Sequence, residues 1–466
     1  MALTGTDLTA KESSVPSGHG PAGAAGPEAA SLWPVALLAA LSALLLAAHF
    51  LRSGLWGGVA ASLGAPLILR VREAWVPRVL VLLSSLAAAL WTAIGLRLAA
   101  ERQAAGEPLL RLALILGAVA AFSLLPALLL SLRRFRARFS ERAESAALSA
   151  SAFGLTIAFL LVLHLKGPAP MLLLNRFLPG GGILEALALG VYAAFVAGRM
   201  ADRKAQPLWR RRVWTLLSVV VLGQFALGLL GLERFLMNPE RLHPPVPALL
   251  VAAPLFRGEG FFMPILFGVT LLLVGPAWCS HLCYIGAWDL RASGARKRPL
   301  VLPRWTRALR WAILAAVVFG ALALRALGVP GWAAAALGIA FGAAGVVLMV
   351  LWSRRTGTMA HCTVFCPIGL LANLGGKVSP FRLKIGALCT DCNACMPVCR
   401  YGALTLKDIA ARRAGLSCTL CGDCLSRCKD GQIGYRFPGL SPDRARNLFL
   451  LLAVSTHAVF LGVTML

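Results

Sequence analysis

Long apolar stretches, separated by short polar segments, make up most of this chain. A helix that crosses a membrane needs about 20 predominantly apolar residues. Stretches of about this length predict eleven spans, near residues 33–51, 54–69, 76–98, 109–131, 147–165, 182–199, 213–231, 261–278, 310–326, 332–352 and 447–466. The stretch at 54–69 is short enough to be re-entrant instead. The pattern therefore predicts an all-α polytopic membrane bundle of about eleven transmembrane helices.

The same pattern divides the chain into five parts. The first 32 residues are rich in Gly, Ala, Pro and Ser, which predicts a disordered cytoplasmic tail. A four-helix membrane segment without an assignable role follows at 33–146, and a membrane core at 147–385. Residues 386–435 form a cysteine-rich module, and residues 436–466 contain the C-terminal transmembrane helix.

Composition and charge agree with a membrane protein. The 466 residues are 58% hydrophobic and only 14% charged, and the mean hydropathy is +0.76. The net charge of +27 comes largely from clusters in alternate loops, at Arg70, Arg72 and Arg78; Arg133, Arg134, Arg136, Arg138 and Arg142; Arg199, Arg203, Lys204, Arg210, Arg211 and Arg212; and Arg291, Arg296, Lys297, Arg298, Arg304 and Arg307. Basic loops on one side are typical of the cytoplasmic face. We therefore predict a multi-pass protein of the bacterial inner membrane, in contact with lipid, and exclude nucleic acid as a partner.

Two runs of four cysteines lie in the cysteine-rich module. Cys389-x2-Cys392-x2-Cys395-x3-Cys399 is followed 19 residues later by a second run of the same spacing, Cys418-x2-Cys421-x2-Cys424-x3-Cys428. This spacing is typical of bacterial-type ferredoxins, in which the fourth cysteine of each run binds the other cluster. The spacing predicts a small α+β module with two [4Fe–4S] clusters, the first held by Cys389, Cys392, Cys395 and Cys428 and the second by Cys418, Cys421, Cys424 and Cys399.

A zinc site or a disulfide framework fits these runs less well. Zinc ribbons use paired C-x2-C units without four thiols per run, and disulfides are disfavoured in a cytoplasmic module. The proline that usually follows the fourth cysteine is replaced by Arg400 and Lys429. The two added positive charges should make the clusters easier to reduce.

The other four cysteines form two C-x3-C pairs. Cys279 and Cys283, like Cys362 and Cys366, belong to a C-x3-C-x-I-G sequence at the end of an apolar span. On an α-helix this spacing puts both thiols on one face, so two such helices can offer four thiolates to one metal centre. The alternative is that they are small buried apolar residues or a structural pair. The repeat favours an additional redox or metal site, with His281 and His361 beside it rather than in it.

At these motifs the chain resembles the membrane-bound polyferredoxins of the NapH, NosR and CcoG type. The resemblance covers about residues 147–435 and rests on 278–286, 361–369, the trailing segment 379–385 and the doubled cluster motif. It implies that the cysteine motifs face the cytoplasm and that electrons pass between the quinol pool and a respiratory or metal-handling partner. Tyr284 stands where the family usually has proline, and neither a c-type haem motif nor a flavin-attachment sequence occurs.

Three functions are open at this point. The first is electron transfer through two [4Fe–4S] clusters between the quinone pool and a membrane or cytoplasmic redox partner, although the only clustered polar candidates for a quinone are Glu233, Arg241 and His243 in a solvated outer loop. The second is a copper reductase or cofactor-assembly protein that binds a soft metal at the C-x3-C thiols. The third is a sensor or scaffold with structural clusters. Cluster reduction by a quinol, copper-dependent reoxidation and redox-independent partner binding separate the three.

Overall fold

The computed structural model describes residues 31–71, 73–136, 139, 143–167, 171–236 and 244–463. The predicted N-terminal tail therefore lies outside the described residues, apart from Ser31 and Leu32. Within the described part, ten helical segments are long and apolar enough to cross a membrane: Trp33–Arg52, Val76–Ala104, Leu110–Ser131, Ser145–Lys166, Gly181–Ala201, Gln206–Leu229, Phe262–Leu282, Trp305–Ala326, Gly331–Thr356 and Pro442–Gly462. The protein is a multi-pass membrane protein, as the apolar pattern predicts.

Eight of these segments are single α-helices, and two are compound. The single ones are α1 (Trp33–Arg52), α3 (Val76–Ala104), α4 (Leu110–Ser131), α6 (Ala143–Lys166), α7 (Gly181–Ala201), α8 (Gln206–Leu229), α12 (Trp305–Ala326) and α17 (Pro442–Gly462). The segment 262–282 joins α10 (Phe262–Val274) to a 3-10 turn at 275–277 and a π-helical turn at 278–282. The segment 331–356 joins α13 (Gly331–Leu348) to a π-helical turn at 349–353 and α14 (Arg354–Thr356).

Short elements connect or flank the spans. They are α2 (Trp56–Gly64), α5 (Arg133–Arg136), α9 (Leu249–Arg257), α11 (Gly286–Ser293), α15 (Pro367–Gly375), α16 (Leu406–Ala410) and the strands β1 (Arg382–Ile385) and β2 (Ile433–Arg436).

The expected span at 54–69 is not one of the ten long helices. It consists of the nine residues of α2 and a six-residue 3-10 helix, Ala65–Arg70, that contains Pro66 near its start. Proline lacks the N–H that an α-helix interior needs, which explains the change of helix type. Together, α2 and the 3-10 helix still run back along α1. At one end Ile68 and Leu69 pack with Val35, at the beginning of α1. At the other end of the bundle the N–H of Gly57 donates to Pro179 O.

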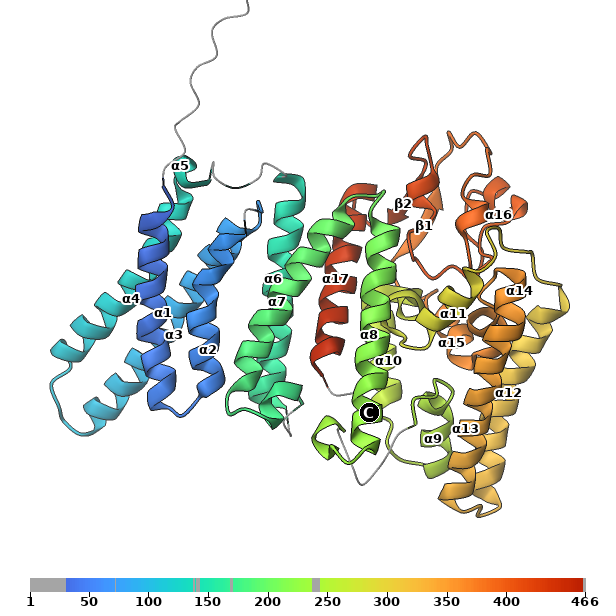
Figure 1. Cartoon of the computed structure of the whole chain (residues 1–466), viewed down its shortest axis with the longest axis horizontal. Coiled ribbons are helices and arrows are strands. Elements are labelled where there is room, and N and C mark those ends of the chain that lie inside the picture. The colour runs from blue at the N-terminus through green and yellow to red at the C-terminus, as the bar shows by residue number, and fades with distance from the viewer. Residues whose placement is uncertain are drawn as a thin grey trace, which may run out of the picture.

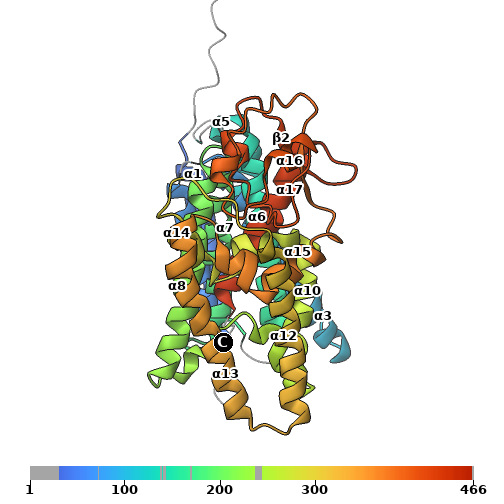
Figure 2. The same ribbon diagram turned by 90° about the vertical axis from the view of Figure 1, so that its right-hand side faces the viewer.

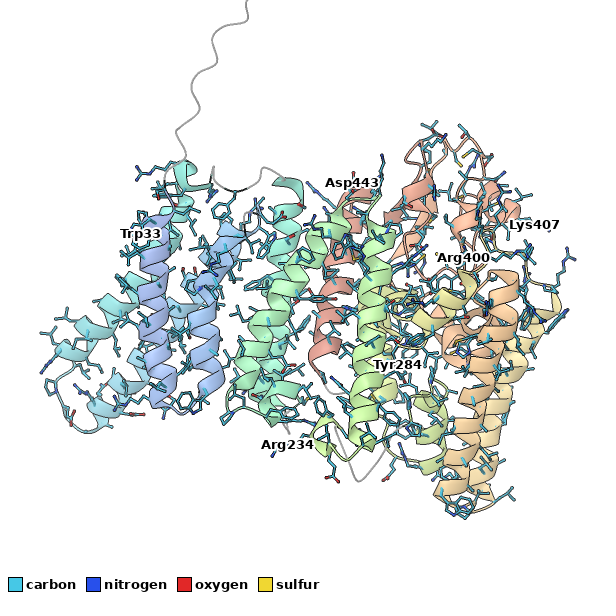
Figure 3. The ribbon with its side chains drawn as sticks, in the orientation of Figure 1. Trp33, Arg234, Tyr284, Arg400, Lys407 and Asp443 are labelled. Carbon is cyan, nitrogen blue, oxygen red and sulfur yellow. The ribbon has the colours of Figure 1, made fainter. Side chains whose placement is uncertain are left out.

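Helix α5, which carries Arg133, Arg134 and Arg136 of one basic cluster, lies at the same end of the bundle as the cysteine-rich module (Figure 1). In Figure 1 the strands and α16 stand above the spans, on the side of the chain's first described residues, and the last turn of α17 lies near the opposite end. Figure 3 places Asp443, Arg400 and Lys407 at the module end and Arg234 at the other end. Arg203, from another basic cluster, pairs with Asp443 at the module end (2.5 Å).

The module rests directly on the bundle. β1 and β2 form a two-stranded antiparallel sheet with Arg382 opposite Arg436 and Ile385 opposite Ile433. β1 begins four residues before the predicted module boundary at 386. The inward side chains of the sheet pack on α17, where the Tyr435 and Phe449 rings stack 4.6 Å apart. Figure 2 shows the module above α15 and α17, so one hydrophobic core continues from the module into the bundle.

Candidate functional site: two cysteine loops above two buried cysteine motifs

The two C-x2-C-x2-C loops have the same backbone conformation. In the first loop Asp391 (φ 52°) and Asn393 (φ 57°) have left-handed conformations on either side of Cys392. In the second loop Leu420 (φ 55°) and Gly422 (φ 79°) flank Cys421 in the same way. Non-glycine residues adopt such φ values at a cost, unless the surroundings hold them there. Alternation of this kind turns successive N–H groups inward to form the concave nests that bind anions, iron–sulfur clusters included.

The fourth cysteine of each run lies near the three cysteines of the other run. Burial raises the pKa of the Cys395 thiol, and the sulfurs of Cys389, Cys392 and Cys428 add to this effect. Burial likewise raises the pKa of the Cys424 thiol, with further contributions from Cys421, Cys418 and Cys399. The structure therefore brings Cys428 into the first set and Cys399 into the second.

A tetrahedral metal ion and a [4Fe–4S] cluster need their thiolate ligands at different separations. Among the described residues, no three His, Cys, Asp or Glu side chains are close enough to hold one metal ion. Four thiolates on a tetrahedral zinc, at about 2.3 Å from the ion, lie within about 4 Å of one another. A [4Fe–4S] cluster takes one thiolate at each of its four irons, so its ligands stand farther apart. The nests and the two groups of four sulfurs suit such a cluster.

The two loops differ in exposure. Cys392, with its neighbours Thr390 and Asp391, is exposed, and Leu388 beside the first loop is 79% exposed. In the second loop Thr419, Leu420 and Asp423 are each only 3% exposed. The first set is thus next to solvent, and the second set is next to the bundle.

Each C-x3-C motif is a single π-helical turn rather than the α-helical face expected from its spacing. The turns are Trp278–Leu282 and His361–Phe365. The N–H of Cys283 donates to Trp278 O (2.9 Å), and the N–H of Cys366 donates to His361 O (2.8 Å). An i,i+4 cysteine spacing is the same for an α-helix and for this wider turn, which is why the spacing alone suggested an α-helix.

The final glycine of each motif closes the turn. A Cβ at Gly369 would lie 2.3 Å from the Cys362 carbonyl oxygen, and one at Gly286 would lie 3.1 Å from the Cys279 carbonyl oxygen and 2.5 Å from the Trp214 ring. The close approach explains why both copies of the motif end in glycine.

Gly369→Ala is expected to destabilise the protein by roughly 1–3 kcal/mol, because the new methyl group overlaps a backbone oxygen that cannot move freely. Gly320→Ala is the matched control, since nothing lies within 4 Å of the corresponding Cβ in α12. Thermal unfolding in mild detergent, followed by tryptophan fluorescence, compares the two. Equal unfolding midpoints for both variants would contradict the role given to Gly369.

Three of the four C-x3-C thiols, those of Cys283, Cys362 and Cys366, lie near one buried carboxyl group. Asp289 of α11 accepts a hydrogen bond from the N–H of Cys362 (3.0 Å), and its Oδ1 is buried with no hydrogen-bond partner among the described residues. Burial raises the pKa of Asp289 to about 6. Burial also raises the pKa of Cys366 to about 12, and the nearby sulfur of Cys283 and the Asp289 carboxyl add to this effect. Cys279 packs against Cys366 in one apolar cluster, so the two motifs face each other.

A buried arginine joins the first motif to the second loop. Arg210 of α8 has no exposed side-chain surface and donates two hydrogen bonds to the Asp423 carboxylate, from Nε (3.1 Å) and Nη2 (2.8 Å). Its Nη1 donates to Ser280 O (3.1 Å), and the Ser280 hydroxyl donates to Thr419 O (2.9 Å). These bonds run directly from the first motif to the loop that carries Cys418 and Cys421.

Tyr401 and Arg400 reinforce this attachment. The Tyr401 hydroxyl donates to Cys279 O (3.0 Å). Arg400, which replaces the usual proline after a fourth cysteine, donates to Gly357 O (2.9 Å) and to the carbonyl oxygens of Ser293 (3.1 Å) and Arg296 (2.6 Å). The replacement thus has a structural use that composition did not suggest.

Two apolar cavities reach the C-x3-C motifs from the membrane-spanning region. The larger, of about 1020 Å³, is lined by α8, α11 and α13 and includes His361 and Cys366 in its wall. The smaller, of about 500 Å³, lies among α9, α10, α12 and α13 and includes Trp278, Cys283 and Tyr284. In Figure 3 Tyr284 lies within the bundle, between the module end and the opposite end.

Sequence reasoning missed several of these residues. Arg210 was counted as a cytoplasmic loop charge, and Asp289, Tyr401 and Asp423 were not singled out. His281 and His361 are buried beside the motifs, as expected, at 3% and 5% exposure. Of the three outer-loop candidates for a quinone, Glu233 begins a 3-10 turn, and Arg241 and His243 lie outside the described residues.

Comparison of the chain with models of protein families, with curated proteins and with solved structures finds no match.

Proposed function

We propose that this chain is a membrane-bound iron–sulfur electron-transfer protein that relays electrons through two [4Fe–4S] clusters between the quinone pool and a redox partner. Each cluster, when bound, accepts and releases one electron. Cys389, Cys392, Cys395 and Cys428 would hold the first cluster, and Cys418, Cys421, Cys424 and Cys399 the second. The module would face the cytoplasm of a bacterial inner membrane, because it shares its end of the bundle with the basic loops.

The observation that carries this proposal is the matched pair of loops. Both loops have left-handed residues on either side of the middle cysteine, and each has the fourth cysteine of the other run among its neighbours. Two independent features, backbone conformation and the grouping of sulfurs, thus support the same arrangement of ligands.

The contacts support an order for the redox centres. The second loop bonds to the first C-x3-C motif through Ser280 and Arg210, and the first loop is exposed to solvent. Electrons from the membrane would therefore reach the cluster of the second loop first and leave through the cluster of the first loop. A soluble or peripheral partner would exchange electrons at the Cys392 side.

The smaller cavity supports a quinone as the membrane substrate. Its walls are mostly apolar, with Arg257 among them, and Tyr284 and Cys283 line it on the side of the first motif. Such a cavity suits a quinone ring, with the Tyr284 hydroxyl as a hydrogen-bond donor to a ring oxygen. Oxidation of one quinol would reduce both clusters by one electron each and release two protons.

The test is anaerobic reduction of the clusters by a quinol analogue. The wild-type protein is expected to lose its visible cluster absorbance on addition of the quinol, and Tyr284→Phe is expected to slow this reaction about fivefold, the value of roughly one hydrogen bond. Reduction by dithionite is the control and should be the same in both proteins. Clusters that dithionite reduces but no quinol analogue does would rule out the quinone as substrate.

One observation favours a second function, reduction of a soft metal such as copper. Cys283, Cys362 and Cys366 lie near the Asp289 carboxyl in two motifs that face each other, and since no three such side chains among the described residues are close enough to hold one ion, the metal would be a substrate and not a resident cofactor. Thiolates select Cu(I) over hard cations. Copper-dependent reoxidation of the clusters that requires Cys362 and Cys366 distinguishes this function from quinol oxidation.

A further inference from the structure

The larger cavity is polar at one end only. Arg291 of α11 and Arg354 of α14 line it at the module end, and both are exposed. Neither side chain forms a hydrogen bond or ion pair with another described residue, and no aspartate or glutamate lines the cavity. Two guanidinium groups that pair with no described residue therefore lie at one end of a mainly apolar cavity.

The rest of the cavity has the length of a lipid chain. Along α13 and its extension the wall runs from Ile339 to Arg354. At 1.5 Å per helical residue this distance is about 22 Å, which exceeds one leaflet of a hydrocarbon core about 30 Å thick. The volume of about 1020 Å³ also reaches the upper end of the roughly 300–1,000 Å³ of small-ligand pockets.

Arginines at the end of a membrane span ordinarily contact the headgroups of whichever lipids are nearby. Here the two arginines belong to neighbouring elements above a cavity that continues past them toward the opposite end. A neutral quinone has no group that needs two cations. A negatively charged headgroup matches them, and its acyl chain matches the apolar wall.

We propose that this cavity binds an anionic phospholipid, with its phosphate at Arg291 and Arg354 and an acyl chain along α13. The acyl chain would pass Phe365 and Cys366, so the lipid would lie against the second C-x3-C motif. Lipid binding can be measured whether or not the clusters are present, so this proposal can fail or hold independently of the proposed electron transfer.

The experiment measures binding of phosphatidylglycerol to the purified full-length protein by native mass spectrometry. Each arginine near an anionic group is expected to contribute about fivefold, so Arg291→Gln with Arg354→Gln should weaken phosphatidylglycerol binding about 25-fold. Arg298→Gln with Arg307→Gln is the matched control, because both residues are basic, exposed and at the same end but do not line the cavity. The control is expected to bind as the wild type does.

A further variant tests the apolar part. Ala343→Phe narrows the cavity along α13 and leaves both arginines in place, so it should also lower the retention of phosphatidylglycerol. Four outcomes overturn the proposal. The wild-type protein could retain phosphatidylcholine or a quinone in place of the anionic lipid, or the control variant could lose as much phosphatidylglycerol as the double arginine variant does. Phosphatidylglycerol binding could also be unchanged in the double arginine variant, or unchanged in Ala343→Phe.

Discussion

Replacing Cys428 with serine is expected to remove the cluster of the first loop and to spare that of the second. Serine keeps the size of the side chain but is a poor ligand for iron. Cys428 lies with Cys389, Cys392 and Cys395, although it is closest in sequence to Cys424. Iron, acid-labile sulfide and visible absorbance should each fall to about half, and Cys399→Ser should give the opposite cluster loss.

Electron paramagnetic resonance of the reduced variants identifies which cluster remains. Cys362→Ser serves as the control, because Cys362 belongs to the C-x3-C site and should leave both clusters intact. Full iron and sulfide in the double variant Cys399→Ser, Cys428→Ser would disprove the exchange of fourth cysteines. Zinc without sulfide in anaerobically purified wild-type protein would disprove the electron-transfer function as well.

Replacing Arg210 with methionine is expected to loosen the module from the bundle. The change leaves the Asp423 carboxylate, whose side chain is 4% exposed, without its two strong hydrogen bonds. Removing one partner of a buried pair costs about 3–5 kcal/mol, and Arg211, whose Nη2 lies 3.7 Å from Asp423 Oδ2, places the loss near the lower end. A loss of about 3 kcal/mol raises the opening equilibrium more than 100-fold. Limited proteolysis within residues 386–435 measures it.

Two further variants separate the charge from the packing. Arg210→Met with Asp423→Leu removes both charges and is expected to recover most of the loss, since apolar side chains often replace a buried pair without penalty. Arg211→Met tests the half-exposed neighbour and should change cleavage little. If Arg210→Met is cleaved no faster than Arg211→Met, the pair does not hold the module in place.

Features that depend on neighbouring residues, such as cysteine intervals and the lengths of apolar stretches, could be read from the sequence. The eight module cysteines stand at intervals that have a chemical meaning without any knowledge of the fold, and their role as cluster ligands stays a prediction. The positions of the spans and the segregation of the arginine clusters also follow from short windows of sequence. The C-x3-C-x-I-G repeat is visible in the sequence, but its local structure was predicted wrongly: both copies adopt the same π-helical turn and not the α-helical face expected from the spacing.

Features that depend on distant residues were not predictable. Arg210 stands beside Arg211 and Arg212 in a basic loop, and nothing near it indicates a partner at Asp423. The larger cavity exists only because α8, α11 and α13 meet. The apolar stretch at 54–69 has the composition of a span, but Pro66 and its short length divide it into two helical pieces.

The burial of the second loop has a consequence for the biogenesis of the protein. Thr419, Leu420 and Asp423 are covered by the bundle, where Thr419 O accepts from Ser280 and the Asp423 carboxylate accepts from Arg210, while Cys418 and Cys421 are partly exposed. If the loops bind the proposed clusters, docking would restrict access to the second loop more than to the first, so we expect iron and sulfide to enter the second loop before the newly made module docks. The exposed first loop can be filled, or repaired after oxidative damage, throughout the life of the protein.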